Sequence, residues 1–176
     1  MNFLLMYSGK NGQTKKIILN IYKYLINKEK KCKIKKITFN ENKDKKLLLY
    51  DKIVIGAAVY YGNFQYSFLK YINQNVRYLN NIPTAFFGVN LLARKKEKNT
   101  VQTNFYMKKF LKNTLWKPKI IDVFAGSLNF KNYKWYEIFI IKIIMQISGN
   151  KININQKYEY TNWKKVQEFS KKVGEL

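Results

Sequence analysis

Short apolar runs recur along the chain and are separated by amphipathic stretches. Three runs, NFLLMY, DKIVIGAAVYYG and IPTAFFGVN, are apolar at almost every position, which predicts strands buried on both faces of a sheet. A further strand is predicted at KIIDVFAGSLNF. CKIKKITF is predicted to be an edge strand, with Ile34 and Ile37 as its apolar positions.

Helical periodicity occupies the stretches between these strands. Ile17, Ile21 and Leu25 recur every fourth residue in a helix predicted from about Gln13 to Lys28. A second helix is expected around Phe68, Leu69 and Ile72, and a third is expected to begin near Thr103. Thr161 is predicted to cap a last helix whose inward-facing residues are Trp163, Val166, Phe169 and Val173.

Strands that alternate with helices predict right-handed crossovers and a parallel sheet. The order of elements favours an α/β fold, a flavodoxin-like doubly wound five-stranded parallel sheet of order 2-1-3-4-5 with helices on both faces. We expect a single domain over residues 1–176, with a long aromatic insertion at about 127–150 after the fifth strand. Ligands of such sheets bind outside the carboxyl ends of the strands.

The composition narrows the possible chemistry. The chain contains no histidine and one cysteine, Cys32, which excludes a Cys/His zinc site and an internal disulfide, so we expect no metal. The formal charge of +24 is typical of proteins that bind nucleic acid or anionic membranes. Arginine occurs only at Arg77 and Arg94, and this excess of lysine indicates compositional drift. We therefore expect no nucleic-acid partner, and a basic nucleic-acid-binding module is the alternative from another class.

The loop SGKNGQT follows the first strand and precedes the first helix. Backbone N–H groups and the helix dipole favour a phosphate at such a position. Ser8, Gln13 and Thr14 are expected to add side-chain hydrogen bonds, while Gly9 and Gly12 let the backbone curl around an anion. The loop matches neither a P-loop nor Gly-x-Gly-x-x-Gly, and an ordinary glycine-containing turn is the alternative.

Two further loops, GAAVYYGN and GVNLLARKKEKN, follow the next two central strands at the same edge of the sheet. Tyr60 and Tyr61 are placed to stack on a flat ring, and backbone groups near Asn90 are placed to meet its polar edge. Together the three loops favour FMN as the cofactor. The alternative is that the two tyrosines are ordinary core or surface aromatics.

Several segments carry a resemblance to a known family: SGKNGQT, VIGAAVYYG, PTAFFGVNLLARKKEKNTVQTN, KFLKNTLWKP and KWYEIFIIKIIMQISG. They resemble the flavodoxin-type, quinone-dependent (menaquinone-dependent) protoporphyrinogen IX dehydrogenases of bacterial haem synthesis. VNLLARK and the Trp- and Tyr-rich insertion discriminate this family from other flavodoxins. The resemblance implies an FMN enzyme that removes six hydrogens from protoporphyrinogen IX and passes the electrons to membrane menaquinone or ubiquinone.

The resemblance also implies contacts to the flavin. They fall on the three loops, at Ser8, Gly9, Lys10, Asn11, Gly12, Gln13, Thr14, Ala58, Tyr60, Tyr61, Gly62, Asn90, Leu91 and Ala93. The chain departs from the family pattern at Gly9 and Asn11, where a hydroxyl residue and an acid are expected. Both changes are compatible with binding a dianion.

The expected substrate carries two propionates, which need cations. Arg94 offers a planar fork of donors, with Lys95 beside it, and a solvated basic loop is the alternative interpretation. No catalytic residue is assigned, because without histidine the proton acceptor is water, a carboxylate or the flavin itself.

The segment WYEIFIIKIIMQI is apolar on nearly every side, which is typical of a helix in a core or at a membrane interface. Substrate and quinone are both lipophilic, so we favour the interface, with Phe139, Ile140 and Ile143 toward lipid. The protein is then expected to lie peripherally on the cytoplasmic face of the bacterial inner membrane.

Two other flavoprotein functions stay open at this point. One is an electron-carrier flavodoxin, which the basic charge and the insertion disfavour, and the other is an FMN-dependent NAD(P)H:quinone reductase. The sequence leaves the oligomeric state and the choice of quinone undetermined.

Overall fold

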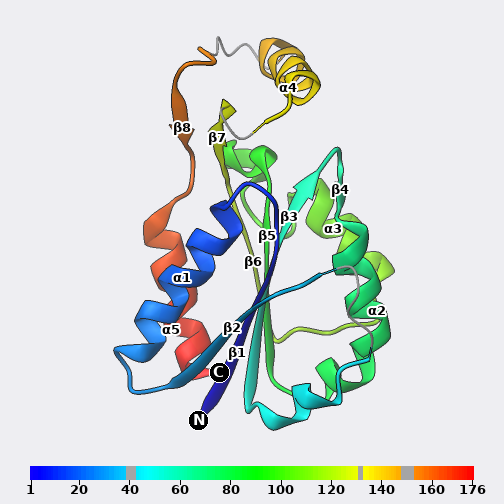
Figure 1. Cartoon of the computed structure of the whole chain (residues 1–176), viewed down its shortest axis with the longest axis vertical. Helices are drawn as coiled ribbons and strands as arrows, with labels where there is room; N and C mark the ends of the chain where they lie inside the picture. The colour runs from blue at the N-terminus through cyan, green and yellow to red at the C-terminus, as the bar shows by residue number, and fades with distance from the viewer. Residues whose placement is uncertain (39–42, 131–132, 148–152) are drawn as a thin grey trace.

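Five parallel strands form the central sheet, in the order β2-β1-β3-β5-β6 (Figure 1). The computed structural model describes residues 1–38, 43–130, 133–147 and 153–176. The strands are β1 (Asn2–Ser8), β2 (Lys31–Lys36), β3 (Lys52–Tyr60), β5 (Thr84–Val89) and β6 (Ile120–Phe124). Numbered among themselves along the chain, they have the predicted order 2-1-3-4-5, so the predicted fold is confirmed. A short strand, β4 (Asn63–Phe64), pairs antiparallel with β3.

Helices cover both faces of the sheet (Figure 1). On one face lie α1 (Gln13–Ile26) and α5 (Trp163–Glu175), and on the other lie α2 (Tyr66–Asn80) and α3 (Phe105–Asn113). Successive residues of β5 point to opposite faces, so Phe86 packs with Trp116 in one core cluster and Phe87 packs with Phe169 in the other. The sheet is therefore buried on both sides, as its apolar strands predict.

Some predicted helix ends differ in the structure. The first helix ends at Ile26 instead of Lys28, and the third begins at Phe105 with Asn104 as its cap. Asn162 caps the last helix by accepting a hydrogen bond from the Lys165 N–H at 3.1 Å. The prediction that Thr161 is the cap is wrong, because its hydroxyl donates to the Ala125 carbonyl at 2.8 Å.

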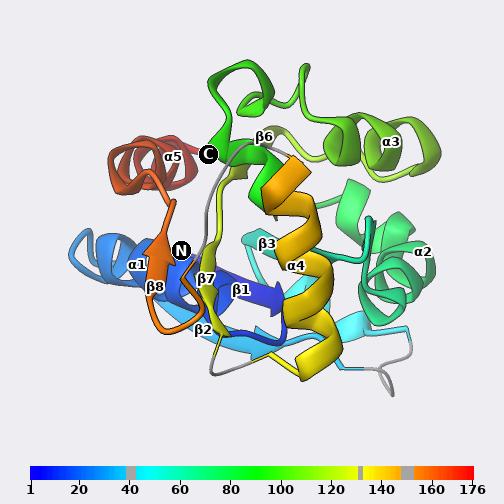
Figure 2. The ribbon, with the colours of Figure 1, turned by 90° about the horizontal axis from the view of Figure 1, so that it is seen from above.

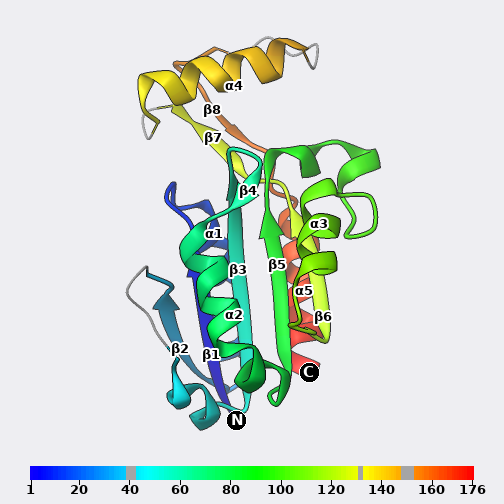
Figure 3. The ribbon, with the colours of Figure 1, turned by 90° about the vertical axis from the view of Figure 1, so that its right-hand side faces the viewer.

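The segment KIIDVFAGSLNF is two strands instead of the one predicted. After β6 the chain leaves the sheet at Ala125 and Gly126, and β7 (Ser127–Asn129) pairs antiparallel with β8 (Lys157–Glu159). Between β7 and β8 lies α4 (Trp135–Ile147), which Figure 3 shows across the carboxyl ends of the parallel strands. The same crossing is visible from above in Figure 2.

Parts of two predictions lie outside the described residues: Phe39 of the edge strand, and residues 131–132 and 148–150 of the insertion. Short 3-10 turns connect the remaining elements: η1 (Lys45–Leu49), η2 (Leu91–Arg94) and η3 (Lys96–Lys98). Among the described helices, none combines the length and apolar character needed to cross a bilayer.

Candidate active site

A cavity of about 550 Å³ lies between the carboxyl ends of the parallel strands and α4. Residues from the loops after β1, β3 and β5, from the start of β7 and from the insertion line it. They are Asn11, Gln13, Thr14, Ala58, Val59, Tyr60, Tyr61, Gly62, Val89, Asn90, Leu91, Leu92, Arg94, Lys95, Tyr106, Gly126, Ser127, Tyr133, Glu137, Ile140 and Ile141. The structure therefore brings the three predicted loops together around one space, beneath the insertion.

The first of these loops starts at the end of β1 and leads directly into α1. Gly12 has φ +84°, a left-handed conformation that favours glycine, and no side chain caps the start of the helix. A Cβ on Gly9 would stand 2.8 Å from the Thr14 hydroxyl oxygen, so glycine allows the loop to pack closely over the helix. The first turn of α1 carries no acidic residue, so its positive end suits a phosphate monoester.

Two of the predicted polar side chains of this loop are bonded to other protein groups. Ser8 is 1% exposed, and its hydroxyl donates to Gln65 Oε1 at 3.0 Å. Gln13 Nε2 donates to Glu159 Oε1 and to Thr161 Oγ1, both at 2.8 Å, and its Oε1 accepts from the Ser127 hydroxyl at 2.9 Å. Ser8 and Gln13 were expected to hydrogen-bond a phosphate, but their side chains instead bond protein groups from distant parts of the chain. Thr14 lines the cavity as expected.

The two tyrosines after β3 lie in different environments. The Tyr60 hydroxyl accepts from the backbone N–H groups of Lys10 at 2.7 Å and Asn11 at 3.2 Å, which ties the second loop to the first. Tyr61 has φ +50°, an unusual value for a residue other than glycine, and is 58% exposed. Both side chains line the cavity, and stacking on a flat ring stays a prediction.

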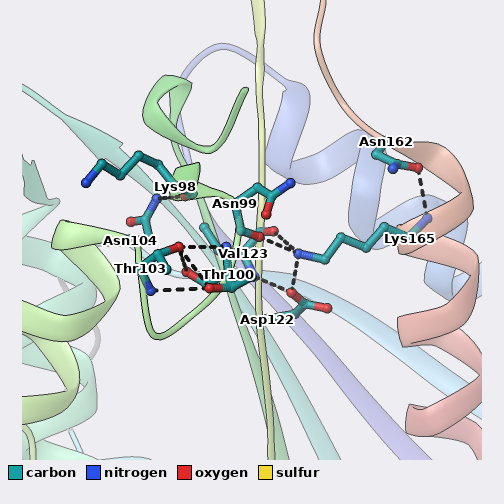
Figure 4. A network of polar contacts seen from close by, with 9 residues as sticks. All are labelled: Lys98, Asn99, Thr100, Thr103, Asn104, Asp122, Val123, Asn162 and Lys165. Carbon is teal, nitrogen blue, oxygen red and sulfur yellow. Dashed lines mark hydrogen bonds and ion pairs between the residues drawn. The ribbon is translucent and has the colours of Figure 1, made fainter. Parts of the chain in front are cut away.

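The loop after β5 is held from below by a pair of amides. Asn90 is buried, and its Oδ1 accepts from the Ala93 N–H and from Asn104 Nδ2, both at 3.1 Å. Asn90 Nδ2 donates to Asn104 Oδ1 at 3.3 Å in return, and Asn104 Nδ2 also donates to the Lys98 carbonyl at 2.9 Å. Figure 4 shows Asn104 beneath this loop. The side chain of Asn90 therefore shapes the loop, which leaves backbone groups to meet a ligand.

A second anchor of the same loop comes from α5. Lys165 Nζ lies 2.7 Å from Asp122 Oδ1 and donates to the carbonyls of Asn99 at 2.8 Å and Val123 at 2.9 Å (Figure 4). One ammonium group thus connects α5, β6 and the end of the loop. The sequence interpretation missed both Lys165 and Asn104. Lys165 belongs to no motif and its partners are distant along the chain, whereas Asn104 ends the segment PTAFFGVNLLARKKEKNTVQTN, which was the available signal.

Arg94 presents an unsatisfied donor at the cavity. Its Nη1 donates to the Leu91 carbonyl at 3.0 Å, while its Nη2 is buried and has no hydrogen-bond partner within the described part of the chain. Buried guanidinium nitrogens are normally hydrogen-bonded, so this one calls for an acceptor from outside the chain. Carboxylate and carbonyl oxygens both suit that position, and Lys95 lines the cavity next to it.

The insertion forms the other wall of the cavity. Tyr133, Glu137, Ile140 and Ile141 line it, and burial raises the pKa of the Tyr133 phenol. The insertion has a small core of its own, in which Leu128, Phe130 and Met145 are buried and Ile138 and Ile141 pack against them.

Outside that core, large apolar side chains of α4 are exposed. Trp135 is 81% exposed, Phe139 is 61% exposed and Ile143 is 42% exposed. Ile140 is also exposed in part, although it lines the cavity. The alternative that α4 merely fills the domain core is thus wrong for these side chains.

Glu137 was not predicted as a site residue. The Tyr61 hydroxyl donates to its Oε1, and the Lys134 N–H donates to its Oε2 at 2.8 Å. These two hydrogen bonds, that from Tyr61 foremost, lower the pKa of Glu137, and the same contact raises the pKa of Tyr61. The available signal was that Glu137 is the single acid in a stretch that is apolar apart from Lys142 and Gln146.

Several predicted site residues do not line the cavity. Ala93 is the buried residue of η2 and is absent from the cavity lining, as are Phe139 and Ile143. Gly9, Lys10 and Gly12 shape the first loop without lining the cavity. Their assignment as flavin contacts stays a prediction.

Known proteins share both the sequence and the fold of this chain. Residues 4–155 match the flavodoxin domain family, and a flavodoxin domain implies flavin binding. Solved flavodoxins share the fold at low identity. Oxidised flavodoxin 1 from Bacillus cereus has a TM-score of 0.51 at 12% identity, covering 87% of this chain and 100% of that one. Reduced Megasphaera elsdenii flavodoxin has a TM-score of 0.52 at 12% identity, covering 71% and 85% respectively.

Two curated relatives are far more similar in sequence. A protoporphyrinogen IX dehydrogenase (quinone) of Escherichia coli strain K12 is 36% identical over 178 residues, covering 100% of this chain and 96% of the relative. A protein of the same name from Leishmania major is 35% identical over 174 residues, covering 98% of this chain and 74% of the relative. The chain has a flavodoxin domain and the predicted sheet order, and it is 36% identical to the Escherichia coli relative along its whole length. This protein therefore belongs to the protoporphyrinogen IX dehydrogenase (quinone) family.

Proposed function

We propose that this protein oxidises protoporphyrinogen IX to protoporphyrin IX with FMN as cofactor and passes the electrons to a membrane quinone. The observation that carries the proposal is one cavity that combines an open helix N-terminus, the unsatisfied Arg94 Nη2 and an apolar ceiling from α4. When bound, the flavin supplies the hydride-accepting chemistry, and the chain supplies binding, orientation and electrostatics.

FMN fits the site better than a dinucleotide does. A single phosphate loop, with Thr14 on the cavity side and the start of α1 behind it, serves one terminal phosphate. The loops after β3 and β5 flank the space beyond, where Tyr60 and Tyr61 are available for contact with a flat ring system.

Two groups of residues bind and orient the porphyrinogen in this proposal. Arg94 and Lys95 meet its propionates, since a guanidinium with a free nitrogen pairs well with a carboxylate. Ile140 and Ile141 of α4 contact the apolar part of the macrocycle and exclude water from it. The polar groups are thus on the loops and the apolar groups on the helix.

We further propose that α4 binds the membrane surface on the cytoplasmic face of the bacterial inner membrane. Trp135, Phe139 and Ile143 are exposed, and Lys134 and Lys142 beside them are also exposed and suit anionic lipid. The 13 residues of α4 span only ~20 Å at ~1.5 Å per residue, which is shorter than a bilayer core of ~30 Å. The helix therefore lies in the interface, where menaquinone or ubiquinone arrives.

The decisive experiment is an anaerobic assay with the purified protein. We expect a yellow protein from which acid releases FMN, and protoporphyrin fluorescence that appears only when both protoporphyrinogen IX and a quinone are present. Turnover with NAD(P)H and quinone but not with porphyrinogen would instead identify a general quinone reductase. A flavin that is reduced by neither donor would identify an electron carrier.

A further inference from the structure

Glu137 places a negative charge in a cavity whose other charged groups are cations. Among the described residues that line the cavity it is the only acid, and Arg94 and Lys95 are the basic ones. The sequence contains no histidine. A proton released inside this cavity therefore has Glu137 as its only carboxylate acceptor among those residues.

The orientation of the carboxylate is set by two donors on different elements. The hydroxyl of Tyr61, in the turn after β3, bonds Oε1, and the backbone N–H of Lys134, just before α4, bonds Oε2. Each oxygen keeps a further acceptor position for a third group. The carboxylate is thus held by both walls of the cavity and is still able to accept a proton.

The chemistry of the proposed reaction requires an acceptor. When the C–H bond of a meso carbon breaks, the hydride leaves with both electrons toward the flavin–quinone oxidant. The remaining cation is delocalised over two pyrrole rings. Its N–H bond then breaks, the electron pair stays on nitrogen and the proton leaves. Each of the three oxidations thus releases one hydride and one proton, six hydrogens in all. Because the product keeps two of the four N–H groups and has lost a hydrogen from all four meso carbons, one proton also shifts from the fourth meso carbon to a ring nitrogen.

We propose that Glu137 is the group that stabilises this cation and accepts the pyrrole proton. The inference rests on the proposed function and names a residue for a step that neither the motifs nor the relatives assign. In the charged state the carboxylate attracts the cation from the cavity wall, where Glu137 is partly buried and solvent screens the attraction less than in bulk water.

The surroundings of Glu137 keep it ionised. Its pKa is lowered chiefly by the hydrogen bonds from Tyr61 and from the Lys134 N–H, which outweigh the opposing effect of burial, and further by the charges of Lys10 and Lys134. The phenols of Tyr61, Tyr133 and Tyr136 are the other titratable groups near this contact. A weak base is sufficient, because the positive charge makes the N–H of an oxidised pyrrole pair far more acidic than that of a neutral pyrrole. Glu137 is partly exposed, so the proton has a route to solvent.

The first test compares two substitutions that each remove one negative charge. Glu137→Gln keeps an oxygen for the Tyr61 hydroxyl but removes the charge and the base, whereas Glu97→Gln removes an exposed carboxylate of η3 that does not line the cavity. We expect Glu137→Gln to lower kcat by about 100-fold or more, with KM nearly unchanged, since general bases contribute about 10²–10⁴-fold. It should also abolish the acid limb of the pH–rate profile. Glu97→Gln should change neither.

A second test measures binding instead of turnover. A dipyrrinium dicarboxylate mimics the cation, and a dipyrryl ketone dicarboxylate is an uncharged analogue that cannot be oxidised at its meso carbon. We expect Glu137→Gln to weaken binding of the dipyrrinium to the flavin-loaded protein at least tenfold, and binding of the ketone by less than twofold. Glu97→Gln should weaken neither by more than twofold.

The outcomes separate this inference from the proposed function. If the unmodified protein fails to oxidise porphyrinogen, the proposed function is overturned. If it does oxidise porphyrinogen and Glu137→Gln retains kcat, the pH profile and the preference for the dipyrrinium, the role of Glu137 is overturned. Should Glu137→Gln fold poorly by circular dichroism, the same binding test is made with Glu137→Asp. If that variant still binds the dipyrrinium more tightly than the ketone, the role of Glu137 is supported. If it is folded and binds both equally, the role is overturned.

Discussion

The two walls of the cavity are built in different ways. The floor, made of the loops 8–14, 58–62 and 89–99, is held by buried side chains whose polar atoms are bonded several times over, such as Gln13, Asn90 and Asn104. The cap, made of residues 127–130, 135–147 and 157–159, has three buried apolar side chains among its described residues. Ser127 and Glu159 at its base are bonded to Gln13, whereas α4 contacts the floor through the hydrogen bond from Tyr61 to Glu137. Much of the apolar surface of α4 is exposed.

This difference matches what each wall is proposed to bind. A floor whose polar groups are already oriented costs little to organise around a small, rigid cofactor. A cap with few buried contacts has low local stability, which suits the entry of a bulky macrocycle and contact with lipid. Four sets of variants test whether the floor and the cap differ in this way.

The largest effect is expected at the outer face of the cap. Phe139→Ser with Ile143→Ser should reduce binding to anionic lipid vesicles by more than 100-fold, since each removed side chain loses roughly 1.5–3 kcal/mol of apolar burial in lipid. Folding and flavin absorbance should be unchanged, because both side chains are exposed. Vesicle co-sedimentation measures the effect.

A matched control lies at the opposite end of the molecule. Leu48 and Leu49 of η1 are similarly exposed, so Leu48→Ser with Leu49→Ser should leave vesicle binding unaltered. A Phe139/Ile143 variant that unfolds or loses FMN would show that these side chains support the protein core. Equal loss of binding in both pairs would show non-specific adsorption.

The next largest effect is expected below the floor. Lys165→Met should lower the free energy of unfolding by about 2–3 kcal/mol, because it removes the cation that pairs with Asp122 and donates to the carbonyls of Asn99 and Val123. Chemical denaturation measures it. Lys164→Met, an exposed neighbour on α5, is the control and should change stability by less than about 0.5 kcal/mol. Equal stability of the two variants would show that the network does not brace the floor.

Two hydroxyl groups of the first loop, those of Thr14 and Ser8, should differ in how much they contribute to FMN binding. Thr14→Ala should weaken FMN binding by about 2 kcal/mol, as expected for a lost bond to a charged phosphate. Ser8→Ala should weaken it by less than about 0.5 kcal/mol, because that hydroxyl already donates to Gln65. Flavin titration of the protein freed of flavin measures both values. Equal losses would mean that Ser8 turns toward the phosphate when flavin binds.

The smallest effect is expected at Arg94. Arg94→Ala should raise the KM for protoporphyrinogen IX about tenfold, which corresponds to about 1.4 kcal/mol, while the FMN content stays the same. Arg94→Lys should recover part of the loss, since lysine supplies the charge without the planar fork. A variant that loses flavin but keeps its KM would assign Arg94 to the cofactor instead.

For the floor, the sequence predicted the strands and loops better than the contacts that their side chains make. Apolar runs and glycines located the strands, the order of the sheet and the three loops that meet at one edge. They did not reveal that Gln13 is bonded to Glu159 and Ser127, because those partners lie more than 100 residues away in the chain. A polar residue in a loop looks the same in a sequence whether it faces a ligand or braces the backbone.

For the cap, the sequence predicted the apolar character of the side chains but not the position of the helix that carries them. A helix that is apolar on nearly every side gives no direction for its faces, so periodicity alone did not choose between the core and an interface. That choice depends on the two-stranded sheet of β7 and β8, which pairs Leu128 with Tyr158 and holds α4 away from the central sheet. The same arrangement brings Glu137 to Tyr61, a contact between residues 76 positions apart.

The sequence by itself thus determined the layered sheet, its strand order and the edge at which a ligand binds, since these follow from local periodicity and from the handedness of crossovers. The tertiary structure determined which side chains are already bonded, which are free and which face α4 exposes. Those properties depend on contacts between distant segments, and burial and hydrogen bonding across such contacts leave no local pattern in the chain.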